Sequence, residues 1–163
     1  MMRRTGMRKQ QPKLTTGWRE WAALPQLNIP AIKVKVDTGA LSSALHAIHV
    51  RYFTEAGRER VAFEIHPIQR RSQPTVRCTA HLVGERLVTS SNGHRERRPV
   101  IRTQFMLGGL VWPIDLTLTN RDSMGFRMLL GRRAMRRRVL VNPSASFVCG
   151  APDRSDTATA PME

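Results

Sequence analysis

Apolar and polar residues alternate along several short stretches of this chain. In residues 31–37, Ile32, Val34 and Val36 alternate with two lysines. A period of two is typical of a half-buried β-strand, because successive side chains of a strand point to opposite faces of the sheet. Similar strand-like runs occupy residues 49–53, 60–68, 75–83, 85–90, 98–107, 111–120, 127–131 and 138–148. The pattern therefore predicts a protein built mainly from short strands.

Turn-forming residues separate these runs. Asn92 and Gly93, for example, tolerate the positive φ of a tight hairpin turn. The one helix that the sequence predicts is short, over residues 132–137. Many short strands at close spacing favour closure of the sheet, which protects strand edges. We predict an all-β fold, a closed β-barrel with one short helix.

The two ends of the chain differ in composition from its middle. Residues 1–16 are basic and lack aromatic or β-branched clusters, so we expect a disordered basic arm there. Residues 151–163 have the same character and are expected to form a disordered tail. A single barrel domain would then span residues 17–150. With 163 residues, the chain can bury a core without disulfides or metal, and its two cysteines do not indicate a disulfide framework.

The formal net charge of +15 predicts attraction to polyanions. Nucleic acid, an acidic polypeptide and an acidic membrane surface all fit, and net charge does not choose among them. The densest basic cluster, within residues 132–138, has few aromatic neighbours, which favours a solvated or phosphate-touching face over a base-reading site. The basic start has no apolar signal region, and no run reaches the ~18 apolar residues of a membrane span. We expect a soluble, cytoplasmic protein that does not associate with membranes.

The stretch Val-Asp-Thr-Gly-Ala, residues 36–40, places Asp37 directly after the alternating strand. An aspartate that activates water to cleave a peptide bond needs a second carboxylate, because one must hold a proton while the other is ionised. Gly39 would let the backbone approach a partner loop, Thr38 could brace the loop with its hydroxyl, and Ala40 leaves the site uncrowded. The triplet alone is a weak motif and favours Asp37 as a strand-end turn residue.

Two separated runs carry a resemblance to a known family. Residues 36–40, together with Met-Leu-Leu-Gly-Arg at 128–132, resemble retropepsin-like aspartic peptidases, in which an apolar-apolar-Gly run packs beneath the aspartate loop. Longer runs across residues 17–150 resemble the bacterial family named for ATP-dependent zinc proteases, which is linked with RimK-type glutamate ligases and has a retropepsin-like fold. Members of that family commonly carry a basic residue after the Asp-Thr-Gly-Ala run, where this chain has Leu41.

The resemblance implies roles for individual residues. Asp37 would be the catalytic acid and base, and Thr38 and Gly39 would position it. Substrate contacts are expected from Ala40, Leu130, Gly131, Asn92 and Gly93, the last two at the tip of a mobile flap over residues 90–96. The chain has a single Asp-Thr-Gly, so the second carboxylate would come from Asp37 of another copy. A C2 homodimer that meets at the Asp37 loop is therefore expected.

The family name raises a zinc site as an alternative. No His-Glu-x-x-His motif occurs, and His46, Cys78 and His81 could supply three ligands only if distant strands converge. Residues 78 and 81 of one strand point to opposite faces, which disfavours joint ligation. The sequence also lacks a Gly-x-x-x-x-Gly-Lys-Ser/Thr nucleotide loop. We predict no metal ligands and no cofactor, with a zinc-dependent protease kept as an alternative.

The favoured function is an aspartic endopeptidase of the retropepsin type. Its strong positive charge would suit acidic or glutamate-tailed protein substrates, because guanidinium groups pair with carboxylates. The rival interpretation is a catalytically silent basic β-barrel that binds RNA or an acidic protein. Substitution of Asp37 by Asn separates these two classes, because only the peptidase needs the carboxylate.

Overall fold

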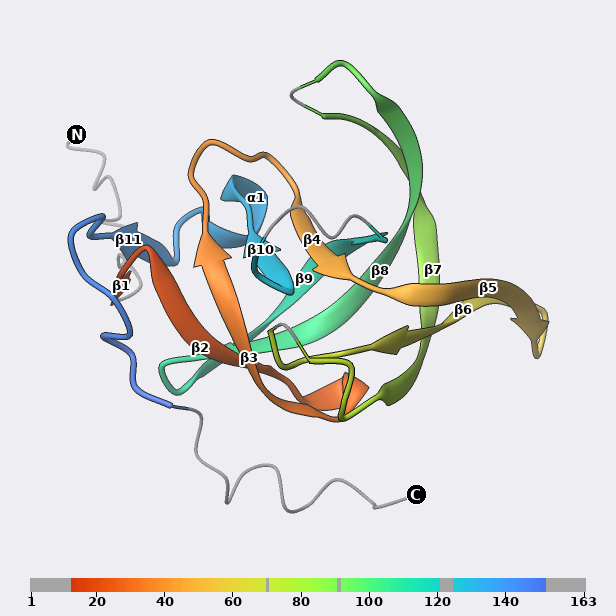
Figure 1. Ribbon diagram of the computed structural model, residues 1–163, viewed down its shortest axis with the longest axis horizontal. Coiled ribbons are helices and arrows are strands. Elements are labelled where there is room, and N and C mark those ends of the chain that lie inside the picture. Colours follow the sequence, from red (N-terminus) through yellow and green to blue (C-terminus); the bar gives the residue numbers. More distant parts are fainter. Residues whose placement is uncertain (1–12, 70, 91, 121–124, 152–163) are drawn as a thin grey trace, which may run out of the picture.

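The alternating stretches form strands in the computed structural model, which describes residues 13–69, 71–90, 92–120 and 125–151 (Figure 1). The strands are β1 (Leu14–Thr16), β2 (Arg19–Leu24), β3 (Ile29–Val36), β4 (Ser43–His46), β5 (Ile48–Glu55), β6 (Arg58–Ile65), β7 (Val76–Thr89), β8 (Arg95–Leu107), β9 (Leu110–Thr119), β10 (Met128–Leu130) and β11 (Val139–Val141). A 3-10 turn, η1 (Pro25–Leu27), and one short helix, α1 (Arg132–Met135), complete the described elements. The predicted all-β fold with a short helix is confirmed for this part of the chain.

Nine of these strands form one sheet in the order β2-β3-β10-β4-β9-β8-β7-β6-β5. The sheet curls until β2 also pairs with β8, through Ala23 and Met106. Six strands thus form a ring in which one junction is a single residue pair, and β7, β6 and β5 continue the sheet beyond it (Figure 1). The sheet therefore approaches the predicted closed barrel only through the single pair between β2 and β8.

The inside of the curled sheet is the hydrophobic core. The side chains of Ile32 and Val34, which alternate with lysines in β3, are buried. Phe105 of β8 packs edge-to-face against Trp112 of β9, with ring centroids 5.1 Å apart. Each such fully buried side chain contributes on the order of 1.5–3 kcal/mol through the hydrophobic effect. The alternation in β3 therefore indicates which face of that strand turns inward.

Residues 14–16 correct the predicted extent of the disordered arm. Leu14–Thr16 forms β1, which pairs in parallel with β11 in a separate two-stranded sheet. Its partner lies near the other end of the sequence, so local composition could not reveal the pairing. The rest of the predicted arm, residues 1–12, and most of the predicted tail, residues 152–163, lie outside the described residues.

Two elements differ in length from their predictions. The helix covers Arg132–Met135 rather than 132–137, because Arg136 and Arg137 leave helical geometry and Arg137 has a φ of 65°. Strand β7 joins two predicted runs through a register shift between Leu82 and Gly84. None of the helices in the described residues is long or apolar enough to cross a membrane.

Candidate active site

Asp37 lies at the carboxyl end of β3, where the chain leaves the sheet. Its backbone N–H donates to the carbonyl oxygen of Leu130 at 2.9 Å, which continues the parallel pairing of β3 with β10. The Asp37 side chain is half-buried, and Thr38 and Gly39 after it are exposed. The sequence pattern thus brings the two runs of the predicted motif side by side, with the carboxylate at the surface.

The loop after β3 holds the carboxylate in place. The Gly39 N–H donates to Asp37 Oδ1 at 2.9 Å, and the Ala40 N–H donates to the Asp37 carbonyl at 3.3 Å. A Cβ on Gly39 would lie 3.1 Å from Asp37 Oδ1, so the absence of a side chain there leaves room for this turn. Gly39 therefore holds the Asp37 carboxylate through its backbone N–H.

Arg132, at the start of α1, braces the same loop and was not predicted from the sequence. Its Nη1 donates to the carbonyl oxygens of Thr38 and Gly39, each at 3.1 Å. Its backbone N–H donates to the Ala40 carbonyl at 2.8 Å. Thr38 thus contributes its carbonyl to the bracing. The only sequence signal was the basic residue directly after the Leu-Leu-Gly run.

Gly131 forms the floor beneath the loop. A Cβ at Gly131 would lie 2.6 Å from both the carbonyl carbon and oxygen of Ser42, closer than real Cβ contacts come. The Gly131 N–H donates to Ser43 Oγ at 3.0 Å. Leu130, beside it, is fully buried, so its side chain belongs to the core while its carbonyl receives the Asp37 N–H. The predicted packing of the apolar-apolar-Gly run under the aspartate loop is present.

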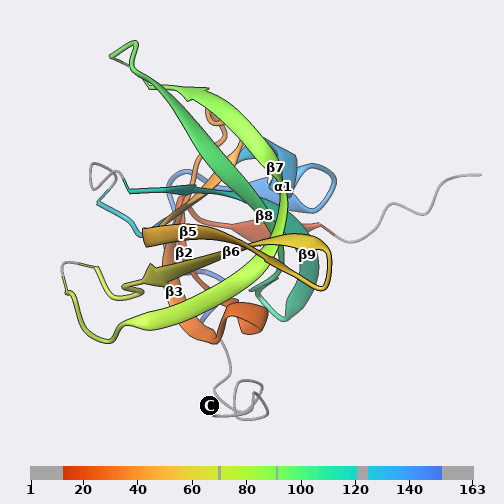
Figure 2. The same cartoon turned by 90° about the vertical axis from the view of Figure 1, so that its right-hand side faces the viewer.

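The predicted flap residues Asn92 and Gly93 lie at the turn between β7 and β8. Gly93 has a φ of 81°, and its N–H donates to the Ser90 carbonyl at 2.9 Å. The hairpin tip rises at the same end of the molecule as the loop that follows β3 (Figure 1), and Figure 2 shows the hairpin extending away from the body of the sheet. Ser91, within the predicted flap, lies outside the described residues.

One side chain joins this hairpin to the aspartate loop. Arg86 of β7 donates from Nη1 to Ser42 Oγ at 2.6 Å. Ser42 follows Leu41 in the loop, and Leu41 is 39% exposed. The hairpin and the loop are therefore in direct contact, although they are distant in sequence.

A cavity of about 320 Å³ lies next to the loop and carries strong positive charge. Ser42 and Ser43 form one wall. The cationic side chains that line it are Arg86, Arg102, Arg133 and Arg138. Asp115 pairs with Arg102 at 2.8 Å, and the Arg138 guanidinium lies 5.5 Å from the ring centroid of Trp112. Four guanidinium groups against one carboxylate make this cavity suited to anionic groups.

The residues considered for zinc are placed apart. His46 ends β4, whereas His81 is exposed on β7. Cys78 is buried, its Sγ contacts the Leu27 carbonyl at 3.4 Å, and burial raises the pKa of its thiol to about 12. Within the described residues, no three His, Cys, Asp or Glu side chains form a group that could hold a metal ion.

A β-sheet that carries an Asp-Thr-Gly loop, with Leu-Leu-Gly packed beneath it, defines the retropepsin-like class. The family model of the retropepsin-like aspartic endopeptidase RimB matches residues 15–152. The chain therefore belongs to the RimB-like family, which confirms the resemblance drawn from its motifs.

Relatives with curated names are longer proteins. The chain is 50% identical over 138 residues to a probable alpha-L-glutamate ligase of Shewanella pealeana, a match that covers 85% of this chain and 30% of the ligase. It is 44% identical over 152 residues to a protein of the same name from Parasynechococcus marenigrum, covering 92% of this chain and 33% of that protein. The chain thus spans about a third of the length of these relatives.

A solved structure shares the fold. The crystal structure of a protein of unknown function from Legionella pneumophila superposes with a TM-score of 0.71 at 27% sequence identity. The superposition covers 85% of this chain and 99% of the Legionella chain. The fold of this chain is therefore shared with nearly the whole of the Legionella chain.

Proposed function

We propose that the chain is an aspartic endopeptidase in which Asp37 from two copies forms the catalytic dyad. The observation that carries this proposal is the half-buried Asp37 carboxylate, held by the Gly39 N–H at 2.9 Å within a loop that Arg132 braces. Membership of the RimB-like family supports it. Because the sequence contains one Asp-Thr-Gly, a dyad needs a second copy of the loop.

The two carboxyl groups would share one proton. Two carboxylates within hydrogen-bonding distance cannot both be ionised readily, so one acts as base and the other as acid. The ionised Asp37 takes a proton from water while the water oxygen bonds to the peptide carbonyl carbon, and the protonated Asp37 of the other copy donates its proton to the carbonyl oxygen. The first Asp37 then gives the proton that it took from water to the peptide nitrogen, while the second Asp37 takes a proton from a hydroxyl of the tetrahedral intermediate. The C–N bond breaks, which releases a carboxylic acid and an amine and restores the shared proton of the dyad.

The substrate class that we propose is an acidic polypeptide, in particular one with a glutamate tail. The arginine-lined cavity beside Ser42 supports it, since Arg86 contacts Ser42 of the loop and Arg133 lines the same cavity. The relatives that carry the ligase name match this chain over about a third of their own length. The other two thirds of those relatives lie outside the match. A ligase that adds glutamate and a peptidase that removes it act on the same kind of chain.

Asp37→Asn tests the proposal. Cleavage of a glutamate-tailed peptide, followed by mass spectrometry, is expected to fall by roughly 10²- to 10⁴-fold or more, because the dyad loses its acid–base group. Sedimentation velocity should show the same dimer in both proteins. The metal chelator EDTA should leave cleavage by the original protein unchanged.

Cleavage that survives Asp37→Asn would contradict the aspartic mechanism, and sensitivity to EDTA would favour the zinc alternative. Binding of RNA or an acidic protein by both proteins, with cleavage by neither, would support the binding module instead. A monomer that cleaves at full rate would exclude a dyad shared between two copies.

A further inference from the structure

The curled sheet of the described residues ends in a free edge at strand β5. The opposite end of the sheet is joined to β8 through β2, whereas β5 pairs with β6 alone. Figure 1 shows β5 and β6 projecting from the ring of strands. Within the described part of the chain, no backbone hydrogen bond from a turn or loop reaches residues 48–55. The outer N–H and C=O groups of β5 can therefore pair with a further strand.

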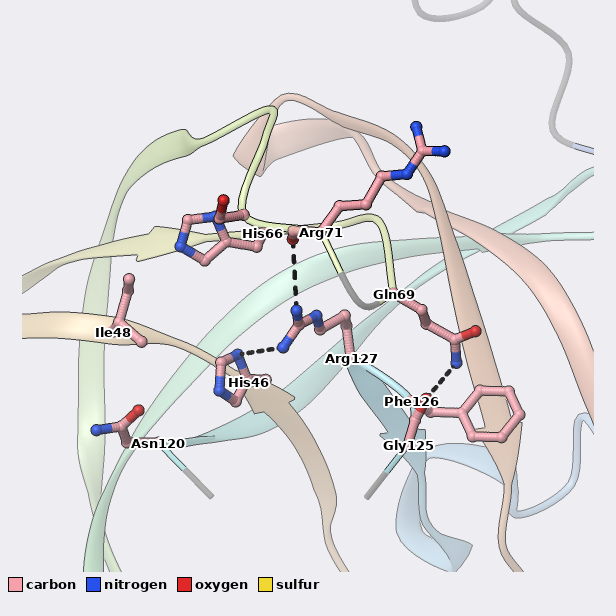
Figure 3. Close-up of a pocket in the computed structure, with 10 residues that line it drawn as sticks. His46, Ile48, His66, Gln69, Arg71, Asn120, Gly125, Phe126 and Arg127 are labelled. Carbon is pink, nitrogen blue, oxygen red and sulfur yellow. Dashed lines mark hydrogen bonds between the residues drawn. The ribbon is translucent and has the colours of Figure 1, made fainter. Parts of the chain in front are cut away.

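Only the outer part of β5 offers a regular edge. His49 has a φ of 52°, and the register with β6 shifts between Ile48 and Arg51, which marks a β-bulge. Ile48, before the bulge, lines a cavity in the body of the protein together with His46 (Figure 3). From residue 51 to residue 55 the pairing with β6 is continuous. A further strand would therefore pair with residues 51–55.

This edge lacks the residues that commonly protect an edge strand from pairing. Proteins protect such edges with proline, lysine, bulges or very short strands. Residues 51–55, Arg-Tyr-Phe-Thr-Glu, contain neither proline nor lysine, and the bulge lies before them. Three of these residues are aromatic or β-branched, which favours an extended strand.

The sequence of the edge is complementary to itself. In an antiparallel ladder hydrogen-bonded and non-hydrogen-bonded residue pairs alternate, so a twofold axis must place one residue opposite its own copy. With Phe53 on the axis, Arg51 of each copy lies opposite Glu55 of the other. With Arg51 or Glu55 on the axis, like charges would lie opposite each other, which is unfavourable. With Tyr52 or Thr54 on the axis, no opposite charges of this stretch would pair.

The charged side chains of this edge are placed to make those pairs. Arg51, Phe53 and Glu55 share one face of β5, because they alternate along the strand. Arg51 is exposed and has no acidic partner within the described residues. The Glu55 side chain is 64% exposed, although its Oε2 lies 3.3 Å from Arg60 Nε. A carboxylate has acceptor sites for two guanidinium groups, so Glu55 can also receive Arg51 of another copy.

We propose that β5 pairs antiparallel with β5 of a second copy of this chain, with Phe53 at the twofold axis. The contact joins two sheets into one and places a Phe53 pair between two Arg51–Glu55 pairs. A pairing of five residues a side belongs among small, transient interfaces, so it forms at high protein concentration. It is separate from the dimer proposed at Asp37, since β3 and β5 are not neighbours in the sheet, and it does not rest on the peptidase function.

Cysteine crosslinking of the full chain tests this register. In Phe53→Cys the two thiols would meet at the axis, where opposite Cα atoms lie about 4.5–5.5 Å apart, a separation that a disulfide spans. At about 0.15 M NaCl, which screens the repulsion between the cationic chains, mild oxidation should give a disulfide-linked dimer, mapped by mass spectrometry to position 53 of both copies. The control Ser144→Cys, exposed and outside β5, should crosslink about fivefold less. Equal crosslinking of the two variants would overturn the proposal.

Charge reversal in the Phe53→Cys protein tests the pairing of Arg51 with Glu55. Arg51→Glu and Glu55→Arg should each lower crosslinking by about tenfold, because two favourable pairs become two repulsive ones. An equal mixture of the two variants should restore crosslinking, since every pair across the axis then joins opposite charges. Circular dichroism checks that each variant is folded.

The two reversals change the net charge in opposite directions, which separates the register from overall repulsion. Crosslinking that rises in Arg51→Glu and falls in Glu55→Arg would show that net charge governs association and would overturn the register. Crosslinking unchanged in both variants, or not restored in their mixture, would overturn it as well. Capture of an added cysteine-containing acidic peptide by Phe53→Cys, without a crosslink between copies, would assign the edge to a foreign strand and overturn the proposal.

Discussion

Gly131 is the residue at which the close approach of two backbones leaves no room for a side chain. We predict that Gly131→Ala lowers the free energy of unfolding by about 1–3 kcal/mol, because its Cβ would lie 2.6 Å from the Ser42 carbonyl group and the loop must move. Urea denaturation measures this change, and peptide cleavage should fall with it.

Gly84 provides the matched control on β7. A Cβ there would meet no atom within 4 Å, so Gly84→Ala should change the free energy of unfolding by no more than about 0.5 kcal/mol. Equal losses in the two variants would mean that the contact between Gly131 and Ser42 does not set the stability of the loop.

Arg132 is predicted to position the loop without stabilising the fold. In Arg132→Gln we expect kcat to fall by about tenfold, because the carbonyls of Thr38 and Gly39 lose their charged donor. The free energy of one hydrogen bond to a charged group corresponds to a change in rate of about that size. Arg132 is exposed, so the unfolding free energy should change by less than about 0.5 kcal/mol. A rise in KM alone, with kcat unchanged, would instead place Arg132 in substrate binding.

The sequence motifs predicted a loop that contains Asp37 and Gly39, with Gly131 beneath it, because each of these features depends on a local run of residues. Arg132 was missed as a bracing residue, since its two acceptors lie in a loop far away in sequence. The Arg86 contact with Ser42 was missed for the same reason. Side chains that act across elements carry no pattern of their own.

At the scale of elements, Glu20 of β2 holds the segment that follows β11. Its carboxylate is completely buried and accepts hydrogen bonds from the backbone N–H groups of Gly17 at 2.7 Å, Val148 at 3.1 Å and Cys149 at 3.0 Å. We predict that Glu20→Gln lowers the free energy of unfolding by about 2–3 kcal/mol, because a neutral amide replaces a charged acceptor of three donors. Urea denaturation tests it.

Glu59 is the control for that measurement, since its side chain is exposed on β6. Glu59→Gln should leave the free energy of unfolding within about 0.5 kcal/mol of the original value. If the two variants are equally stable, the buried carboxylate does not hold the C-terminal segment.

Alternation predicted β3 and β6 well, but it could not predict β4. Strand β4, Ser43–His46, is buried along its whole length, so it shows no period of two. It pairs in parallel with β9 and antiparallel with β10, which covers both of its edges. Strand β1 escaped prediction for another reason, because its short pairing with β11 depends on a segment far along the chain.

For the whole molecule, the net charge of +15 predicts that the proposed cleavage depends on salt. The KM for a glutamate-tailed peptide should rise several-fold as NaCl increases from about 0.05 M to about 0.5 M, because salt screens the attraction between arginines and carboxylates. A glutamine-tailed peptide of equal length should show little change. Equal salt dependence of the two peptides would contradict recognition of acidic tails.

The two ends of the described chain lie against each other. The Sγ of Cys149 contacts the Thr15 carbonyl at 3.5 Å, and the Asn142 N–H donates to the Thr16 carbonyl at 2.8 Å. A longer polypeptide can therefore enter and leave this fold at one place on its surface, as inserted and fused domains do. Joining this fold to a larger neighbour would therefore need no change to the loop that carries Asp37.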